Sequence, residues 1–570
     1  MLKRHLPILS WLPHYNRRLC GADLLAGVIV TVMVIPQSLA YAILAGLPAE
    51  VGLYASLLPL LAYALLGTSR TLAVGPVAIV ALMTGTALAK VATPGTPEYL
   101  HAALVLSLLS GLMLIAMGLL RMGFLANFLS HPVIGGFLSA SGILIAASQA
   151  GHLFGIDVDA AGLLPHLAEI GRDLPQLHAP TFAIGIGTLL FLLFMRRYGS
   201  PLQQKLGVPT RLAELLTRAG PVLAVTVTTS LAWQFDLARH GVAVIGDIPR
   251  GLPPITLPQF DASLWRGLLV PAFLISVVGF VESVSMGQML AARRRERISP
   301  NQELLGLGGA NLAAAFSAGM PVTGGLSRTV INYDAGARSP MAGMFAAAGI
   351  ALVTLFFTPL LYHLPIATLA ATITVSILTL VDMPMIRQTW RYSRSDFSAM
   401  AVTIVLTLGE GVEAGIIGGV ALSIGLFLYR TSRPHSALVG RIPGTEHFRN
   451  VVRHDTETSS HLALLRIDES LYFANARYLE DTVYDLVATH PELEHVVVIC
   501  SAVNLVDASA LESLDAINAR LKDSGVTLHL AEVKGPVMDQ LKRSDFLDAM
   551  TGRVFLSTYA AWRELANPSQ

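Results

Sequence analysis

Long apolar runs separated by short polar stretches make up most of the chain as far as Arg433. A helix that crosses a bilayer needs about 20 apolar residues, and fewer where it is interrupted inside the protein. The pattern predicts about fourteen membrane segments, several of them too short to cross alone. The predicted segments are Leu24–Ala45, Val51–Leu66, Leu72–Ala89, Ala102–Leu120, Phe128–Ala150, Thr181–Met195, Pro221–Trp233, Leu268–Leu290, Leu304–Ala318, Gly324–Tyr333, Gly343–Leu361, Ile366–Val381, Ala399–Leu408 and Val412–Tyr429.

Positively charged residues predict the orientation of these segments, because Lys and Arg near helix ends favour the cytoplasmic side. Basic groups lead into the first segment or follow an even number of segments, whereas loops after odd segments carry mixed or acidic charge. Both termini are therefore predicted to be cytoplasmic, in a multi-pass protein of the cell membrane, the bacterial inner membrane. The basic groups lie within residues 3–18, 196–218, 293–297, 387–394 and 430–433.

After Arg433 the pattern changes to that of a soluble α/β domain. Short β-branched runs, Leu462–Ile467, Val496–Ser501 and Val526–Val533, alternate with helical patterns such as Ser509–Lys522. The boundary is expected near Pro434–Pro443, where Pro, Gly and Ser occur together. The predicted organisation is a cytoplasmic segment over residues 1–23, a transmembrane domain over 24–433 and a soluble domain over 434–570.

Composition narrows the classes of function. The chain is 53% hydrophobic and 14% charged with a mean hydropathy of +0.60, which is too apolar for an ordinary soluble enzyme. A net charge of +1 argues against nucleic acid as a partner. Two cysteines and dispersed histidines show no metal-ligand spacing, so we expect no metal and no cofactor, with the histidines at the surface or in loops. No GxxxxGK[ST] motif is present to drive an ATP-powered pump.

Two interrupted segments carry the strongest functional signal. Thr71–Val80 reads TLAVGPVAIV and Ala318–Thr329 reads AGMPVTGGLSRT, and they are the third and tenth segments, the same place in two halves of seven. Gly and Pro stop each helix at mid-membrane, where irregular backbone is tolerated only if it lines a cavity. The pattern predicts an inverted-repeat transporter whose site lies between two half-helix N-termini, which suit an anion.

Arg328 lies at the start of the second half-helix, and an arginine at this depth is costly unless it pairs or meets a ligand. It is the best candidate for the counter-charge of an anion. The alternatives are a permanent ion pair or an arginine whose head lies nearer the interface. Ser327 beside it can donate a hydrogen bond to an oxyanion, or it can simply cap the helix.

Glu282 lies inside the eighth segment with apolar residues on both sides. Burial disfavours the charge of a carboxylate, whereas a nearby cation such as Arg328 restores it, and a proton carrier needs that balance. The alternative is a fixed Glu–Arg pair that holds two helices together. In the first segment Gln37 and Tyr41, after Pro36, are four residues apart and share a helix face. They line the predicted cavity or, alternatively, only join helices by hydrogen bonds.

Several motifs resemble the SulP sulfate permease family with its appended STAS domain. They are PQSLAY at Pro36–Tyr41, PAEVGLY at Pro48–Tyr54, Gly75-Pro76, MPVTGGLSR at Met320–Arg328, NLVDASAL at Asn504–Leu511 and VKGP at Val533–Pro536. The resemblance runs in order along almost the whole chain. It implies a seven-plus-seven inverted repeat, in which a core domain moves past a gate domain, and it implies a homodimer and an elevator-like mechanism.

The resemblance also implies roles for single residues. The anion site would use Gln37 and Tyr41, the backbone after Pro76 at Val77 and Ala78, and Ser327 with Arg328. An acidic residue in the eighth span of proton-coupled members matches Glu282, whereas sodium-coupled bicarbonate relatives carry aspartate there. Some relatives have an aromatic residue where this chain has Val77, so detailed selectivity does not transfer. Ser509 matches the region of a phosphorylated serine in related domains, although a serine opening a helix is first of all an N-cap.

The resulting hypothesis is a non-enzymatic secondary transporter that imports a small anion, sulfate or a C4-dicarboxylate or bicarbonate, by proton symport. Its expected partners are the anion, protons, membrane lipid, a second copy of the chain and cytoplasmic proteins that bind the STAS domain. The alternatives are a sodium-coupled transporter, an uncoupled or channel-like conductor in which Glu282 is structural, and a membrane anchor whose function lies in the STAS domain.

Overall fold

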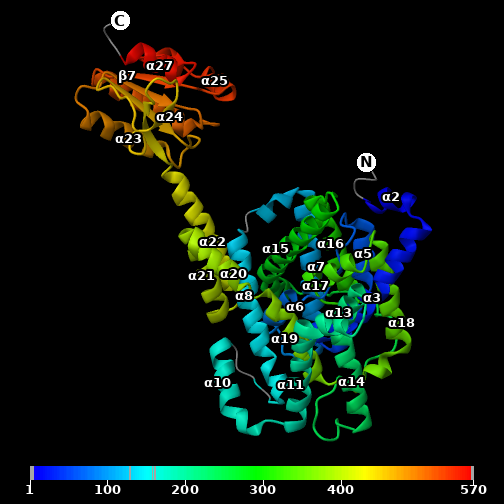
Figure 1. The fold of residues 1–570 in the computed structure, drawn as a ribbon. Helices are drawn as coiled ribbons and strands as arrows, with labels where there is room; N and C mark the ends of the chain where they lie inside the picture. The colour runs from blue at the N-terminus through cyan, green and yellow to red at the C-terminus, as the bar shows by residue number, and fades with distance from the viewer. Residues whose placement is uncertain (1–5, 128–129, 157, 159–161, 567–570) are drawn as a thin grey trace. The chain divides into compact units, whose positions relative to one another are not determined.

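The computed structural model describes residues 6–127, 130–156, 158 and 162–566. The described chain forms two compact units, which divide between Leu422 and Ser423, and each is considered by itself below (Figure 1). The predicted start of the fifth segment at Phe128 lies outside the described residues, as do the first five and last four residues of the predicted terminal regions.

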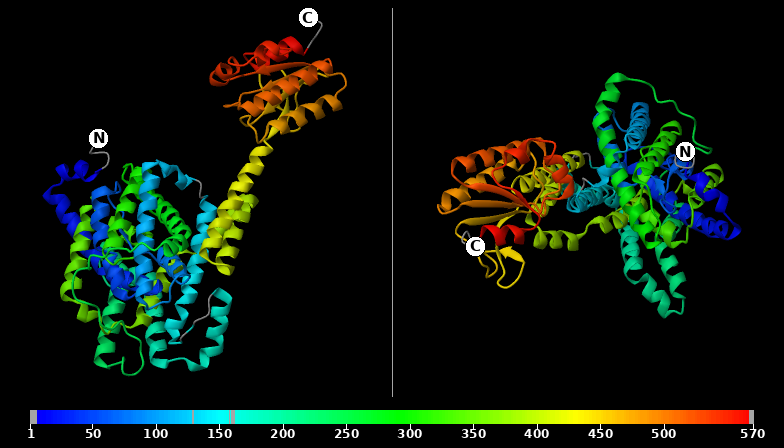
Figure 2. Two further views of the ribbon diagram at one scale, coloured as in Figure 1. Left: turned by 180° about the vertical axis from the view of Figure 1, so that it is seen from behind. Right: turned by 90° about the horizontal axis from the view of Figure 1, so that it is seen from above.

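The first unit is almost entirely helical, and its long helices run alongside one another (Figures 1 and 2). The apolar helices are α3 (Arg17–Leu44), α4 (Ala49–Tyr54), α5 (Leu58–Leu66), α6 (Ala78–Leu88), α7 (Pro97–Leu119), α8 (His131–Ser148), α9 (Ala150–Phe154), α11 (Ala179–Phe194), α14 (Gly220–Gln234), α15 (Ala262–Arg293), α16 (Pro300–Phe316), α17 (Leu326–Asp334), α18 (Met341–Phe356), α19 (Ile366–Ile377), α21 (Arg394–Gly409) and α22 (Val412–Ser432), which continues into the second unit. Shorter or more polar elements are α2 (Ile8–Trp11), η1 (Leu12–His14), η2 (Met122–Asn127), α10 (Leu163–Asp173), η3 (Leu174–Gln176), η4 (Met195–Gly199), α12 (Ser200–Lys205), α13 (Thr210–Arg218), η5 (Thr358–Leu361), η6 (Leu378–Leu380) and α20 (Met383–Tyr392).

Eight helical stretches within the described residues are long and apolar enough to cross a bilayer. Helices suit this environment because they satisfy their own backbone hydrogen bonds where no water is available. Small residues let helices approach closely, as where a Cβ on Gly111 of α7 would lie 3.0 Å from the Gly308 carbonyl of α16. The helical membrane fold predicted from the sequence is confirmed, whereas the number of spans and the internal repeat stay predictions.

The two interrupted segments meet each other at the centre of this unit. Val74–Gly75 (β1) and Thr323–Gly324 (β2) pair as antiparallel strands, with Val74 opposite Gly324. α6 and α17 begin directly after these strands. Two segments about 250 residues apart therefore satisfy each other's backbone groups where lipid could not.

Side chains from neighbouring helices hold the second break in place. Asn311 of α16 both donates to the Val322 carbonyl at 2.8 Å and accepts from the Val322 N–H at 3.0 Å. Ser283 of α15 accepts from the Gly324 N–H and lies 2.8 Å from the Thr323 hydroxyl. Side chains of α15 and α16 thus provide hydrogen-bond partners for the non-helical backbone at Val322 and Gly324.

The second unit is an α/β domain whose six-stranded sheet has the order β4-β3-β5-β6-β7-β8. β5 to β8 are parallel, and β3 is antiparallel to β5. α23 and α24 pack on one face of the sheet and α27 on the other (Figure 1). The elements are β3 (Ser436–Arg441), β4 (Phe448–Asn450), β5 (Leu462–Ile467), α23 (Ala476–Thr489), β6 (His495–Ile499), α24 (Ala508–Asp523), β7 (Thr527–Ala531), α25 (Gly535–Leu541), α26 (Phe546–Ala549), β8 (Val554–Phe555) and α27 (Thr558–Leu565).

Two features of this unit differ from the sequence-based expectations. The proline-rich stretch expected at the domain boundary contains strand β3, because Ala437 and Val439 alternate inward and are buried. The histidines are not all at the surface, since His529 on β7 is buried in a sheet that helices cover on both faces. Burial beside His495 and Arg553 lowers the pKa of His529 to about 4.

Candidate functional site

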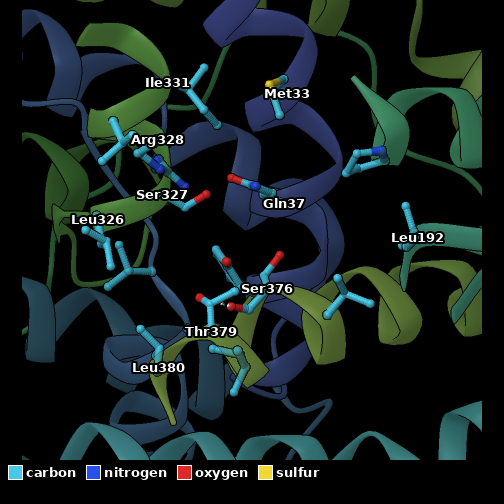
Figure 3. A pocket seen from close by; sticks show the side chains of 18 of the residues that line it. Met33, Gln37, Leu192, Leu326, Ser327, Arg328, Ile331, Ser376, Thr379 and Leu380 are labelled. Carbon is cyan, nitrogen blue, oxygen red and sulfur yellow. Dashed lines mark hydrogen bonds between the residues drawn. The ribbon is translucent and has the colours of Figure 1, made fainter. Parts of the chain in front are cut away.

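One cavity of about 590 Å³ lies beside the starts of α6 and α17. Helices from distant parts of the sequence contribute to its wall, and Figure 3 shows Gln37 of α3 with Ser327 and Arg328 of α17 turned toward the same space. Every membrane-unit residue that the sequence singled out lines this cavity, namely Gln37, Tyr41, Val77, Ala78, Glu282, Ser327 and Arg328.

The two half-helices present uncapped N-termini at this cavity. Neither α6 nor α17 has a side-chain hydrogen bond at its N-cap position, Val77 or Gly325. The first intrahelical hydrogen bond of α6 runs from the Ala81 N–H to the Val77 carbonyl, and that of α17 runs from the Thr329 N–H to the Gly325 carbonyl. The preceding N–H groups carry the positive end of the helix dipole, and although the Leu326 N–H of α17 faces Glu282, an anion here would still find donors from both half-helices.

Arg328 is 3% exposed and its guanidinium is only partly satisfied. Nη2 donates a hydrogen bond to the Pro76 carbonyl of the other interrupted segment. Nη1 is buried without a hydrogen-bond partner among the described residues. The absent side chain of Gly75 leaves the space that this nitrogen occupies, because a Cβ there would overlap Nη1. Arg328 is thus seated against the backbone with a charged donor to spare.

Glu282 on α15 lies across from this guanidinium. The Glu282 carboxylate faces the Leu326 N–H and is attracted by the charge of Arg328. Within the described chain, however, no nitrogen of Arg328 lies within 4.0 Å of a Glu282 oxygen, so the two do not form an ion pair. The fixed Glu–Arg pair that the sequence left open is therefore absent from this structure. Oε2 of Glu282 is buried without a partner. Glu282 also borders a second, apolar cavity of about 110 Å³.

Two carboxylates in this unit are fully buried, and both have saturated surroundings. Glu303 accepts hydrogen bonds from the Tyr63 hydroxyl at 2.7 Å, from the Thr68 N–H and hydroxyl, and from the Ser69 N–H at 3.1 Å. Asp23 accepts from the Arg338 N–H and from the Ser339 N–H and hydroxyl. Both hold distant segments together, and neither was singled out from the sequence, because their partners are more than 230 residues away.

The remaining predicted residues have free polar groups at the cavity. Gln37 and Tyr41 are each 6% exposed, and neither side chain makes a hydrogen bond within the described chain, so they do not join helices in the way the alternative interpretation required. Ser327 is the second residue of α17 rather than its cap, and its side chain is exposed to the cavity. These groups are available to a ligand.

Three polar residues on the opposite wall were not recognised as site residues. Ser376 lies in the last turn of α19 and Thr379 lies in η6 (Figure 3). The Thr379 hydroxyl donates a hydrogen bond to the Ser376 carbonyl at 2.7 Å. Arg196 in η4 was counted only as a positive charge that sets topology. The proline that follows it, Pro201, was the one available sequence signal for an irregular helix there.

Ser509 in the second unit lies at the start of α24, but it does not cap that helix. Asp507 is the N-cap, and its carboxylate accepts from the Ala510 N–H at 2.9 Å. Ser509 lies two residues after Asp507, and its side chain is exposed. The expectation of an N-cap role for Ser509 was wrong, because Asp507 reaches the same N–H groups first.

A bundle of membrane helices around a cavity with uncapped half-helices and a buried arginine defines a transporter that moves anions. Comparison of the sequence with protein families agrees: residues 21–403 match the sulfate permease family and residues 453–561 match the STAS domain. The chain belongs to the sulfate permease family and carries a C-terminal STAS domain.

Relatives align with this chain over nearly its whole length. The chain is 33% identical to a probable sulfate transporter of Mycobacterium tuberculosis, over 94% of this chain and 93% of that one. It is also 33% identical to the probable sulfate transporter 4.2 of Arabidopsis thaliana, over 95% of this chain and 80% of the other. Both alignments extend across the two units.

Solved structures have the same fold. Murine Slc26a9, an anion transporter in the inward-facing state, matches with a TM-score of 0.89 at 24% identity, over 99% of this chain and 94% of that one. The transmembrane domain of the cyanobacterial bicarbonate transporter BicA matches with a TM-score of 0.61 at 23% identity, over 71% of this chain and 98% of that one.

Proposed function

We propose that this protein is a secondary active importer of a small anion, with sulfate and C4-dicarboxylates as the leading substrates and bicarbonate as the third candidate. The anion would lie between the N-termini of α6 and α17, beside Arg328. Supporting this, the cavity offers uncapped N–H groups, the unpartnered Nη1 of Arg328 and the free hydroxyl of Ser327. Gln37 and Tyr41 would contribute further hydrogen bonds, and Val77 and Ala78 the backbone of the first half-helix.

We further propose that Glu282 carries the coupled proton. The observation that carries this proposal is a contrast among carboxylates: the buried Asp23 and Glu303 accept several short hydrogen bonds, whereas Glu282 is half-buried at the anion cavity and its buried Oε2 has no partner. A carboxylate with unsatisfied oxygens gains most from a proton. Import of the proton with the anion also reduces the charge moved against the membrane potential, about 2.3 kcal/mol per charge per 100 mV.

Transport would follow an elevator-like alternation in a homodimer, with both termini on the cytoplasmic side of a bacterial inner membrane. In support, the cavity is lined both by α3, α6, α15 and α17, which belong to the predicted core domain, and by α11, α14 and α19, which belong to the predicted gate domain. Sliding of one group past the other would expose the same site alternately. Residues 24–433 would form the transporter and residues 434–570 the regulatory domain, in which Ser509 is a candidate phosphorylation site and the surface a candidate binding site for cytoplasmic proteins.

The test is uptake into proteoliposomes of labelled sulfate and labelled succinate, with and without an inward proton gradient. Wild type should accumulate one of these anions when the gradient is applied. Glu282→Gln should still exchange the anion but lose gradient-driven accumulation, while Glu282→Asp keeps a titratable group and part of the coupling. Arg328→Ala should lose uptake in either condition, because the buried counter-charge is gone.

Other outcomes would favour a different mechanism. Accumulation that follows a sodium gradient and ignores pH would identify a sodium-coupled transporter. Anion current without saturable uptake would identify a channel-like conductor, with Glu282 in a structural role. No movement of any of the three anions, together with a cellular defect upon deletion of residues 437–570, would identify an anchor for partners of the STAS domain.

A further inference from the structure

The anion cavity is lined by a second cation besides Arg328. Three charged side chains line the cavity among the described residues: Arg328, Glu282 and Arg196. We infer that Arg196 is a second anion-binding residue, and that with Arg328 it makes the site prefer divalent over monovalent anions. The inference rests on the proposed anion site and adds the charge class of its substrate.

Local geometry explains why Arg196 lines the cavity. The segment Met195–Gly199 (η4) is a π-helical turn between α11 and α12. Pro201 causes this widening, because its ring clashes with the carbonyl four residues earlier, at Arg197, and it has no N–H to donate. A π-turn inserts one extra residue and changes the direction of the side chains around it. Arg196 then lines the cavity, whereas its neighbour Arg197 does not.

Close packing keeps this turn at the cavity wall. A Cβ on Gly199 would lie 2.9 Å from the Thr217 hydroxyl, and a Cβ on Gly220 would lie 3.6 Å from Met195 Cβ. Thr217 and Gly220 line the cavity too. The small residues therefore bring η4 against the end of α13 and the start of α14, which keeps Arg196 in the cavity wall.

The side chain of Arg196 is exposed, and its contacts leave it donors for a ligand. Nη1 donates one long hydrogen bond of 3.4 Å to the Val375 carbonyl. This carbonyl belongs to the last turn of α19, where the helix dipole is negative and would repel an anion. Arg196 offsets that negative end and still has most of its five N–H donors unused. No carboxylate forms an ion pair with it within the described chain.

The charges of the cavity then match a divalent anion. Two arginines face one carboxylate, so the cavity carries a single net positive charge when Glu282 is ionised and two when Glu282 is protonated. A protonated Glu282 with a divalent anion bound would balance the two arginine charges, of which that of Arg328 is buried and that of Arg196 is exposed and partly screened by solvent. A monovalent anion would leave one positive charge uncompensated.

The experiment measures sulfate binding to the purified full-length protein in nanodiscs, with nitrate as a competing monovalent oxyanion. Coulomb energy scales with ligand charge, so the logarithm of the affinity loss should be twice as large for the divalent anion. For Arg196→Gln we expect about a threefold loss for nitrate and about a tenfold loss for sulfate. Arg197→Gln, the matched control on the same turn, should change either affinity by less than about twofold.

A further variant, Arg196→Lys, separates charge from capping. Arg196→Lys keeps the charge and should keep the ratio of sulfate to nitrate affinity within about twofold of wild type, even if the hydrogen bond to Val375 is lost. If Arg196→Gln proves too unstable to purify, a ratio for Arg196→Lys more than about twofold below that of wild type overturns the inference, because the charge at this position is still present. Equal losses for the two anions in Arg196→Gln would indicate a structural cap and overturn the inference.

The result also separates this inference from the proposed function. Sulfate binding that Arg328→Ala abolishes but Arg196→Gln and Arg196→Lys leave intact would retain the anion site and refute the role of Arg196. Failure of the wild-type protein to bind either anion would refute the proposed function itself, and the second cation with it.

Discussion

Gly75→Ala tests whether anion binding depends on the position of the Arg328 guanidinium, without substituting a charged residue. The Cβ of alanine would overlap Nη1 of Arg328 and lie 3.2 Å from its Cζ. Gly75 does not have a positive φ, so alanine adopts the same backbone without strain. The overlapping atom is the far end of a flexible side chain, so Arg328 rather than the backbone should move.

The cost follows from the contacts that Arg328 would lose. Displacement breaks the hydrogen bond from Nη2 to the Pro76 carbonyl, and a charge-assisted bond of this kind contributes about 1.5–3 kcal/mol. Each 1.4 kcal/mol corresponds to about a tenfold change in an equilibrium constant. If the anion depends on a guanidinium held in this position, sulfate affinity should fall by about tenfold to a hundredfold.

The assay compares sulfate binding and thermal unfolding of the purified protein with those of Gly187→Ala. Gly187 lies on α11, and a Cβ added to it would meet no atom within 4 Å, so alanine there should leave binding within about twofold and help the helix slightly. A Gly75→Ala protein that unfolds at the wild-type temperature and binds sulfate with wild-type affinity would refute the reasoning, since Arg328 would then not need its present seat.

Two remaining predictions concern stability. Glu303→Gln places an amide NH₂ against groups that donate to Glu303, so it should cost about 2–4 kcal/mol of unfolding free energy, measured as a lower unfolding temperature. Glu282→Gln should cost less than about 1 kcal/mol, because Oε2 of Glu282 has no partner to lose. Equal losses would contradict the contrast between a saturated and an unsatisfied carboxylate. The pKa of His529, about 4 in the folded domain, is below its usual value of about 6.5, so the unfolded domain binds more protons between those pH values and stability is lost as pH falls from 7 to 5. Between pH 7 and pH 5 this shift gives up to about 2 kcal/mol, and about 1 kcal/mol after allowance for solvent screening; hydrogen exchange of residues 527–531 in the full chain should report this loss, and a loss that persists in His529→Gln would refute its origin in this side chain.

Much of the fold followed from local pattern, because lipid imposes simple rules on a chain. Apolar runs must become helices, and a Gly-Pro break such as Gly75-Pro76 is tolerated only inside protein. The α/β alternation after Arg433 was equally readable, and β5 has the predicted bounds Leu462–Ile467. Boundaries were less certain where proline accompanied a real strand, as at β3, because one buried alternating pair outweighed the local loop signal.

The candidate site was half predictable. The sequence by itself singled out Arg328 and Glu282 as ionisable groups in apolar surroundings, since a charge in a membrane segment is costly enough to stand out. Only the tertiary structure decided that β1 pairs with β2, that Glu303 is satisfied while Glu282 is not, and that Arg196 shares a cavity with Arg328. The physical reason is that hydrogen-bond partners and cavity walls come from segments hundreds of residues apart, and a sequence read locally shows the cost of a buried charge but not the groups that offset it.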